Sequence, residues 1–148
     1  MWYLEKVATS HANVILHIAD DILAPIYGSQ DKAYAEWFNP DSNKRAFVPV
    51  SEGVSGGLLS LKVSKDKSFL KISTLLVLEE SKGKGCASAM LAHAIKFASN
   101  NGYLKIKVTV SETKPESVAF FQKNGFVIVS SVLGKYTDGV TEHTLVKG

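Results

Sequence analysis

The sequence of 148 residues is poor in cysteine and in long hydrophobic runs. Cys86 is its only cysteine. This excludes an internal disulfide and a cysteine-rich zinc site and is typical of a reducing compartment, so we expect the cytosol. The longest wholly apolar runs, such as 75–78 and 126–129, have four residues, whereas a membrane-spanning helix needs about 18. Because no signal peptide is recognisable either, we expect no membrane partner.

Charge of one sign is not concentrated anywhere along the sequence. The chain has 17 Lys and Arg against 14 Asp and Glu, a formal net charge of +3, and the basic residues are spread rather than grouped. This weak bias would suit an anionic cofactor, and it equally describes an ordinary solvated surface. It is too weak to predict a nucleic-acid partner.

The length and composition predict one compact domain spanning residues 1–148. Hydrophobic residues make up 45% of the chain and charged residues 21%, and domains of roughly 100 to 150 residues are the commonest. A chain of this length buries about 68–70% of its unfolded surface. Such a core needs neither disulfides nor a structural metal.

Hydrophobic periodicity predicts an α/β fold. Strands are expected at residues 2–9, 45–50, 54–63, 69–77, 103–110, 126–133 and 140–147. Helices are expected from a Ser10 cap to Pro25, at residues 30–38, at residues 87–98 and from Pro115 to Asn124. This order predicts a mixed, mostly antiparallel central sheet of about seven strands flanked by about four helices.

The strand at 69–77 and the helix at 87–98 enclose a glycine-rich loop. The strand is mostly apolar at its end, which predicts a central position with both faces buried. Apolar residues recur along the helix at the spacing of one face packed on a sheet. In the loop, Gly83 and Gly85 allow sharp turns, and the following helix offers unpaired N–H groups and a positive dipole end. We predict an anion site here.

Two well-known phosphate loops do not fit this segment. A Walker loop needs a glycine five residues before Gly83-Lys84, where Leu78 stands. A dinucleotide-binding loop starting at Gly83 needs a third glycine, where Ser88 stands.

The segment resembles the acyl-CoA loop of the GNAT acetyltransferase superfamily, whose pattern is Gln or Arg, two free positions, Gly, one free position, then Gly or Ala. Lys82, Gly85 and Ala87 stand at these positions. The resemblance extends from Phe69 to the Gly-Phe pair at Phe126 and includes an apolar pair in the following helix, Met90-Leu91. It implies a GNAT-like fold and acetyl-CoA as co-substrate.

The resemblance also implies a set of co-substrate-binding residues. These are Leu76, Val77, Leu78, Lys82, Gly83, Lys84, Gly85, Cys86, Ala87 and Ser88. The loop N–H groups and the Ser88 hydroxyl would hold the pyrophosphate, and pantetheine would lie along 76–78 like an added strand. An N–H near Val77 or Leu78 would polarise the thioester carbonyl.

Three positions depart from the family pattern. Lys82 keeps the charge of the usual Arg but lacks its planar guanidinium group, which can bind a phosphate through two N–H donors at once. Lys114 replaces an Asn, and Phe121 replaces the Tyr whose hydroxyl is taken to protonate the leaving thiolate in many relatives. Tyr136 is a substitute acid only if its turn folds toward the cleft.

No general base is assigned from the sequence, because the strand at 69–78 has no carboxylate. Glu79 and Glu80 are expected at the solvent-exposed edge of the loop. Among the histidines His11, His17, His93 and His143, the last, beside Glu142, is the best candidate. None of them has a metal-ligand spacing, so we expect no metal.

Aromatic residues cluster in the segment that often lines the acceptor pocket in this superfamily. They are Tyr27, Tyr34, Trp37 and Phe38. Core packing accounts for some of them, whereas Trp37-Phe38 could wall an apolar acceptor site.

We expect an N-acetyltransferase that moves an acetyl group from acetyl-CoA to a primary amine of a small molecule or peptide. A non-catalytic acyl-CoA-binding module and a toxin-like aminoacyl-tRNA acetyltransferase are the alternatives. Nucleic acid is not the expected partner, and a homodimer is left open.

Overall fold

The computed structural model describes residues 1–135 and 138–148. Its strands are β1 (Tyr3–Lys6), β2 (Lys44–Ser51), β3 (Val54–Ser55), β4 (Gly57–Lys62), β5 (Phe69–Val77), β6 (Lys105–Ser111), β7 (Val127–Leu133) and β8 (Thr141–Lys147). Its helices are α1 (Ala12–His17), α2 (Ala24–Tyr27), α3 (Asp31–Phe38), α4 (Cys86–Asn100) and α5 (Pro115–Lys123). Within the described residues, no helix combines the length and the apolarity needed to cross a bilayer.

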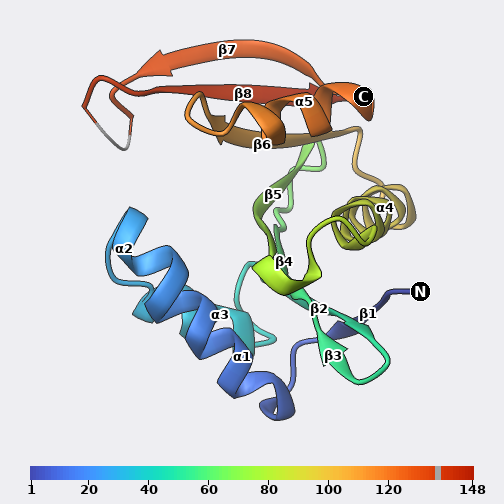
Figure 1. Ribbon diagram of the computed structural model, residues 1–148. Coiled ribbons are helices and arrows are strands. Elements are labelled where there is room, and N and C mark those ends of the chain that lie inside the picture. Colours follow the sequence, from blue (N-terminus) through green and yellow to red (C-terminus); the bar gives the residue numbers. More distant parts are fainter. Residues whose placement is uncertain (136–137) are drawn as a thin grey trace.

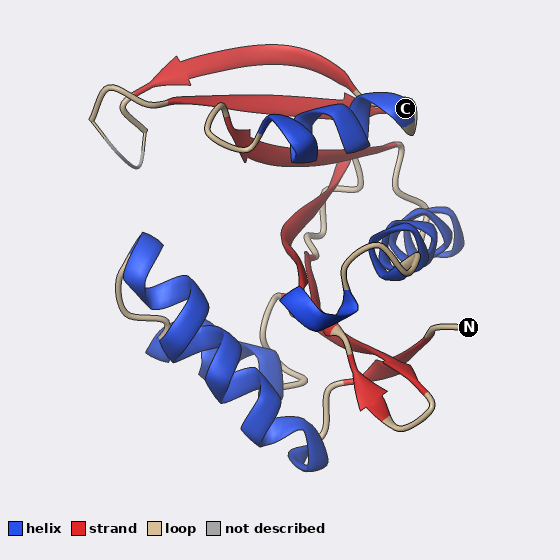
Figure 2. Cartoon of the chain, viewed as in Figure 1, coloured by secondary structure: helices blue, strands red, loops and turns tan. Residues whose placement is uncertain are grey.

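The strands form one mixed sheet in the order β1-β2-β4-β5-β6-β8-β7, with β3 paired to β2. Neighbouring strands run antiparallel, except for the parallel pair of β5 and β6. Helices α1–α3 lie on one side of the sheet and α4 on the other (Figure 1), and α5 packs against β6 (Figure 2). The predicted fold class is confirmed.

Two hydrophobic clusters hold the helices to the sheet, one on each face. The cluster under α4 and α5 includes Leu61, Leu70, Met90, Phe126 and Leu145. The cluster under α1–α3 includes Ile15, Ile18, Trp37, Val48 and Leu58. Alternation along the strands sends successive side chains to opposite clusters, as Leu58 and Leu59 show.

The first helical segment runs past Pro25, so the predicted end at this residue is wrong. Between α1 and α2 the chain makes a wider π-helical turn over Ile18–Leu23, and Pro25 sits in the first turn of α2. The Ala24 N–H bonds five residues back to the Ala19 carbonyl. A proline needs no donor in the first turn of a helix, so the change of helical register absorbs it.

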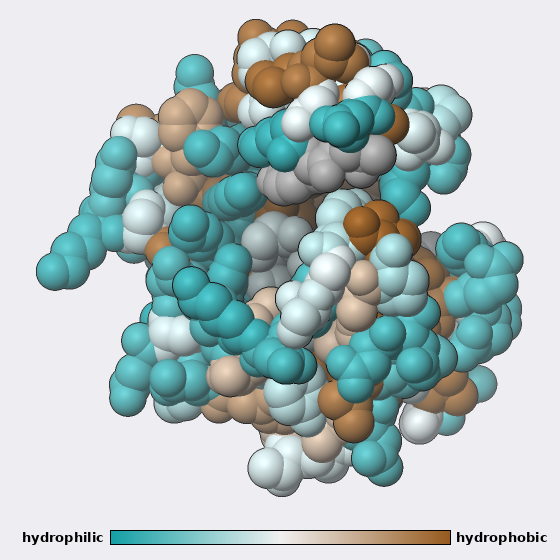
Figure 3. Space-filling view, turned by 90° about the vertical axis from the view of Figure 1, so that its left-hand side faces the viewer, coloured by the Kyte–Doolittle hydropathy of each residue, from teal (hydrophilic) through white to brown (hydrophobic). Residues whose placement is uncertain are grey.

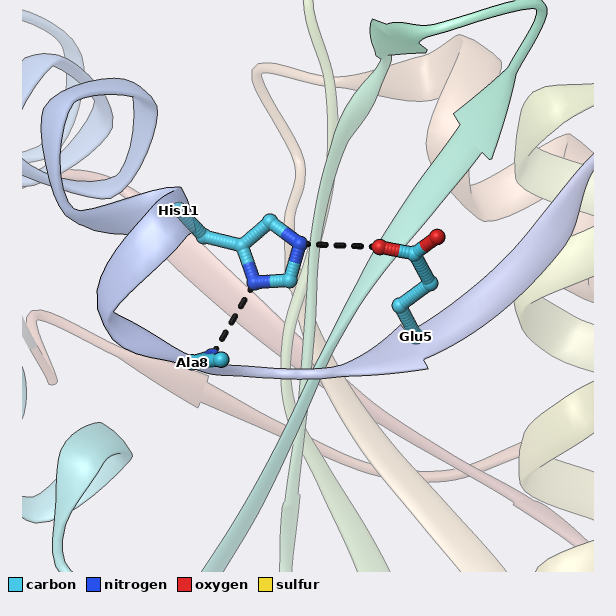
Figure 4. A network of polar contacts seen from close by, with 3 residues as sticks. All are labelled: Glu5, Ala8 and His11. Atoms are coloured by element: carbon cyan, nitrogen blue, oxygen red, sulfur yellow. Dashed lines mark hydrogen bonds and ion pairs between the residues drawn. The ribbon is translucent and has the colours of Figure 1, made fainter.

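The predicted Ser10 cap is also wrong, because His11 performs this function. The Ala8 N–H donates to His11 Nδ1 over 3.0 Å, and the His11 N–H donates to the Ala8 carbonyl over 2.9 Å. The other ring nitrogen, Nε2, lies 3.0 Å from Glu5 Oε1 on β1 (Figure 4). This network ties the start of the helical segment to the edge strand.

Strands β5 and β6 separate after a short pairing, and this positions the site. Their register covers Phe69–Ile72 against Lys105–Val108, and β5 continues to Val77 beside β4 alone in the described part of the chain. A bulge at Ser73 shifts the β4–β5 register at the point of separation. The predicted central position of this strand is confirmed, whereas the predicted burial of both faces is wrong at 75–77, since these residues are only half-buried along an open edge.

Strand β7 ends the sheet on the other side. All seven of its residues are exposed, and five are large and apolar: Val127, Ile128, Val129, Val132 and Leu133. A group of apolar atoms is visible at the top of the space-filling view (Figure 3).

Candidate active site

A cavity of about 860 Å³ opens where β5 and β6 separate. Its walls come from five parts of the chain: the α1–α2 segment, β5, the glycine-rich loop with the start of α4, β6 with α5, and β8. Figure 3 looks onto the side of α2 and the β7–β8 hairpin, where hydrophilic side chains surround a hollow. The cavity brings together segments that are more than 80 residues apart in the sequence.

Most residues predicted to hold the co-substrate line this cavity. They are Leu76, Val77, Lys82, Gly83, Gly85, Cys86, Ala87 and Ser88. Leu78 and Lys84 lie beside it: Leu78 is 5% exposed and packs in the α1–α3 cluster, and the carbonyl of Lys84 accepts a hydrogen bond from Trp2 Nε1 over 3.0 Å. The Trp2 contact fixes the middle of the loop to the N-terminal segment.

The glycine-rich loop is open on its cavity side. Gly83 and Gly85 have φ values of 75° and 81°, in the left-handed region where glycine carries no steric penalty. A Cβ at either position would meet no atom within 4 Å. Gly85 caps α4, and the N–H groups of the first helical turn have no partner within the helix. The loop therefore presents donors, a positive dipole end and free space to one region.

Lys82 forms an ion pair with Glu79, just before the glycine-rich loop. Its Nζ lies 2.8 Å from Glu79 Oε2, and both side chains are exposed. The hydrogen bond and the charge of Glu79 raise the pKa of Lys82. An exposed pair of this kind contributes little to stability, so Lys82 is available to exchange Glu79 for another anion.

The strand β5 offers one free row of N–H groups to the cavity. The Leu78 N–H donates to the Gly56 carbonyl over 2.8 Å and is therefore engaged with the neighbouring chain segment. Because N–H groups alternate sides along a strand, the Val77 N–H points to the open edge. Gly57, paired with Val77, has no room for a side chain, because a Cβ there would overlap the Leu76 carbonyl.

Glu142 is a candidate functional residue that sequence reasoning missed. It lies on β8 opposite Ser111 of β6, it is 6% exposed, and it lines the cavity. Its Oε2 atom is buried without a hydrogen-bond partner among the described residues. A buried polar atom without a partner is rare and unfavourable, and it commonly marks a functional position.

The histidines are engaged elsewhere and none is among the described residues that line the cavity. His143, the best sequence candidate, is next to Glu142 and so points to the opposite face of the strand, where its Nδ1 lies 2.7 Å from Ser131 Oγ. His17 pairs with Asp21, and His93 packs edge-on against Phe47. Burial, and to a lesser degree Lys96, lowers the pKa of His93.

The predicted aromatic wall is only partly present. Tyr27 lines the cavity together with Ile22 and Ile26, whereas Trp37 and Phe38 do not. Trp37 is 6% exposed and its indole N–H donates to Ser60 Oγ over 3.1 Å, so the expectation for Trp37-Phe38 is wrong. Phe38 packs against Tyr34 instead.

The other two departures from the family pattern, Phe121 and Lys114, both line the cavity. Phe121 reaches the cavity but is 4% exposed and packs edge-on against Phe126, as a core residue does. Lys114 lies at the rim, beside the start of α5. Tyr136 lies outside the described residues.

Comparisons with known proteins agree with this geometry. A family model described as "Acetyltransferase (GNAT) family" matches residues 13–126, more than half of the chain. No curated protein matches the sequence.

Several solved structures share the fold. A GCN5-related N-acetyltransferase from Kribbella flavida has a TM-score of 0.83 at 18% identity, over 99% of this chain and 96% of that one. The spermidine/spermine N-acetyltransferase SpeG from Vibrio cholerae has a TM-score of 0.79 at 18% identity, over 98% and 91%. An IAA acetyltransferase from Bacillus cereus has a TM-score of 0.74 at 19% identity, over 99% of both chains.

Proposed function

The chain belongs to the GNAT family of acetyltransferases, which are acyl-CoA-dependent N-acyltransferases, and from this premise we propose that it moves an acetyl group from acetyl-CoA to a primary amine. The observation that carries the proposal is the free edge of β5 leading into the open glycine-rich loop, within one cavity. A structural neighbour named for the N-acetylation of spermidine and spermine supports a small amine as acceptor.

The co-substrate would bind along β5 and the loop. Backbone N–H groups from Gly83 to Ala87 and the Ser88 hydroxyl would hold the pyrophosphate at the start of α4. Pantetheine would pair with the open edge of β5 as an added strand does. The thioester would then lie near Val77, whose free N–H would donate to the carbonyl oxygen.

The reaction is a direct transfer between the two bound substrates. The neutral amine nitrogen attacks the thioester carbon, the new N–C bond forms and the C–S bond breaks. The nitrogen loses one proton, and the departing thiolate gains one, so the products are the amide and free CoA thiol. A donor such as the Val77 N–H, aimed at the developing oxyanion, contributes about 3 kcal/mol to the transition state.

Glu142 is the residue that we propose as base. Its buried Oε2 has no partner among the described residues, so it can bind the ammonium form of the acceptor and take its proton, directly or through one water. Glu142 lies on β8, a different element from β5 and the glycine-rich loop that would hold the co-substrate.

The substitution Glu142→Gln tests this role, because it keeps the shape and removes the basic oxygen. We expect kcat to fall about 100-fold or more, the usual contribution of a general base, while calorimetry shows unchanged CoA binding. Glu112→Gln, at an exposed position just after β6, is the matched control and should leave kcat unchanged. Full activity of a folded Glu142→Gln enzyme would remove Glu142 from the mechanism.

The pair Gly85→Asn and Gly85→Asp tests the loop. Both residues tolerate a positive φ better than other side chains, and Gly85 has free space for them. Only Asp adds a negative charge beside the pyrophosphate, so we expect CoA to bind Gly85→Asp about tenfold or more weakly than Gly85→Asn. Equal dissociation constants for the two variants would show that the pyrophosphate binds elsewhere.

A further inference from the structure

Four lysines form a row across the middle of the sheet. Lys44 on β2 is paired with Lys62 on β4, Lys62 with Lys71 on β5, and Lys71 with Lys107 on β6. Directly paired residues point to the same face of a sheet, and neighbouring strands are about 4.8 Å apart. This lysine row is invisible in the sequence, because its members come from four separate segments.

The lysine row is not a device that protects a sheet edge. Lysines often stand on edge strands, where they prevent pairing with other chains, but the edges here are β1 and β7. Like charges directly opposite each other destabilise a sheet. None of the ion pairs among the described residues neutralises a member of the row.

Two members of the row have lowered pKa values, with burial as the main cause and neighbouring lysines as a further one. Burial, followed by the charges of Lys135, Lys62, Lys107 and Lys44, lowers the pKa of Lys71. Burial also lowers the pKa of Lys44, which Glu36 partly offsets. An anion bound along the row would reduce this repulsion.

An exposed aromatic ring lies beside the lysine row. Phe69 is two residues before Lys71 and therefore lies on the same face of β5. The Phe69 side chain is 37% exposed. Lys107 Nζ lies 5.1 Å from the centre of the Phe69 ring. Lys105, paired with Phe69, adds another exposed charge. Regularly spaced cations next to an exposed ring are the features that hold single-stranded nucleic acids, with phosphates on the cations and a base on the ring.

We propose that the lysine row and Phe69 form a binding surface for single-stranded nucleic acid. The phosphates lie on Lys62, Lys71 and Lys107, and one base stacks on Phe69. Lys71 also lines the cavity, so the surface begins at the wall of the candidate active site. Binding requires neither acetyl-CoA nor acetyl transfer, and its test is independent of the proposed function.

Fluorescence anisotropy with a labelled oligouridylate of about twelve nucleotides, within the usual site sizes, measures the binding. Glutamine replaces the three lysines at 62, 71 and 107 together, because it keeps most of the aliphatic stem and removes the charge. The control replaces Lys6, Lys96 and Lys123, which are exposed and lie outside the row, with glutamine. Both variants lose the same net charge. A parallel titration with oligodeoxythymidylate distinguishes RNA from DNA as the source of the strand.

We expect the row variant to bind about tenfold or more weakly, with the slope of log K against log salt reduced by about 2, and the control to change little. Phe69→Ala should weaken binding about fivefold or more, and Leu104→Ala, another exposed apolar residue, should not. No binding by the unaltered protein at low salt, or equal losses in the row and control variants, would overturn the proposal. The proposal would also be overturned if polyglutamate bound as tightly as the oligonucleotide and Phe69→Ala had no effect. This result would indicate that the surface binds an acidic polypeptide.

Discussion

At the residue scale, Cys86 shows how a loop position and its side chain differ in function. Cys86 is among the residues that line the cavity, yet it is only 2% exposed and belongs to the core under α4. Burial raises the pKa of the thiol to about 11, although the start of a helix would otherwise favour the thiolate. Desolvation therefore dominates over the dipole here.

We expect Cys86 to be unreactive in the folded protein. With a pKa of about 11, only about one thiol in a thousand is ionised at pH 8, and the sulfur is covered. Maleimide labelling followed by mass spectrometry should therefore be slow until denaturant unfolds the chain, with CoA making no difference. Rapid labelling of the native protein that CoA suppresses would place the thiol in the cleft instead.

Cavity-lining residues were predictable where one local segment carries the signal. The loop from Lys82 to Ser88 could be found because its glycines lie between a strand and a helix in the sequence. Glu142 could not, because its burial depends on β6 and β7, to which β8 pairs. The one signal available in the sequence was a carboxylate inside a strand pattern.

At the element scale, the long periodic segments were predicted well and the irregular one was not. The apolar helix face predicted at residues 87–98 falls within α4, and the seven predicted strands are all present. The π-helical turn before Pro25 escaped prediction, since single-residue rules place a helix end before proline. Tertiary packing of Ile15, Ile18 and Leu23 against the sheet keeps the segment helical through the turn.

The lysine row predicts a stability change in the same strands. Lys62→Thr removes two like-charge pairs, with Lys44 and Lys71, and should raise the free energy of unfolding by about 0.5–1 kcal/mol in urea titrations. Lys6→Thr is the control, because Lys6 is paired with Phe47 and gains the same strand preference without relief of repulsion. The difference should shrink at high salt. Equal effects of the two substitutions would mean that the repulsion is negligible.

At the scale of the whole molecule, the order of elements was enough to predict the class of fold. The point where β5 and β6 separate was not predictable, because it depends on the bulge at Ser73 and on a pairing between segments more than 30 residues apart. The cavity, the buried carboxylate and the lysine row all follow from strand register. Residues that are distant in sequence become neighbours only through it.

The open edge of β5 has a consequence for amide hydrogen exchange. The Leu76 and Leu78 N–H groups point to β4 and its preceding residue, while those of Leu75 and Val77 point to the cavity. In heavy water we expect fast exchange at Leu75 and Val77 and slow exchange at Leu76 and Leu78, resolved by NMR. If CoA pairs with this edge, it slows the two fast amides alone, and uniform slowing along the strand would contradict this pairing. The alternation of exchange rates would then report, amide by amide, which side of one strand receives the co-substrate.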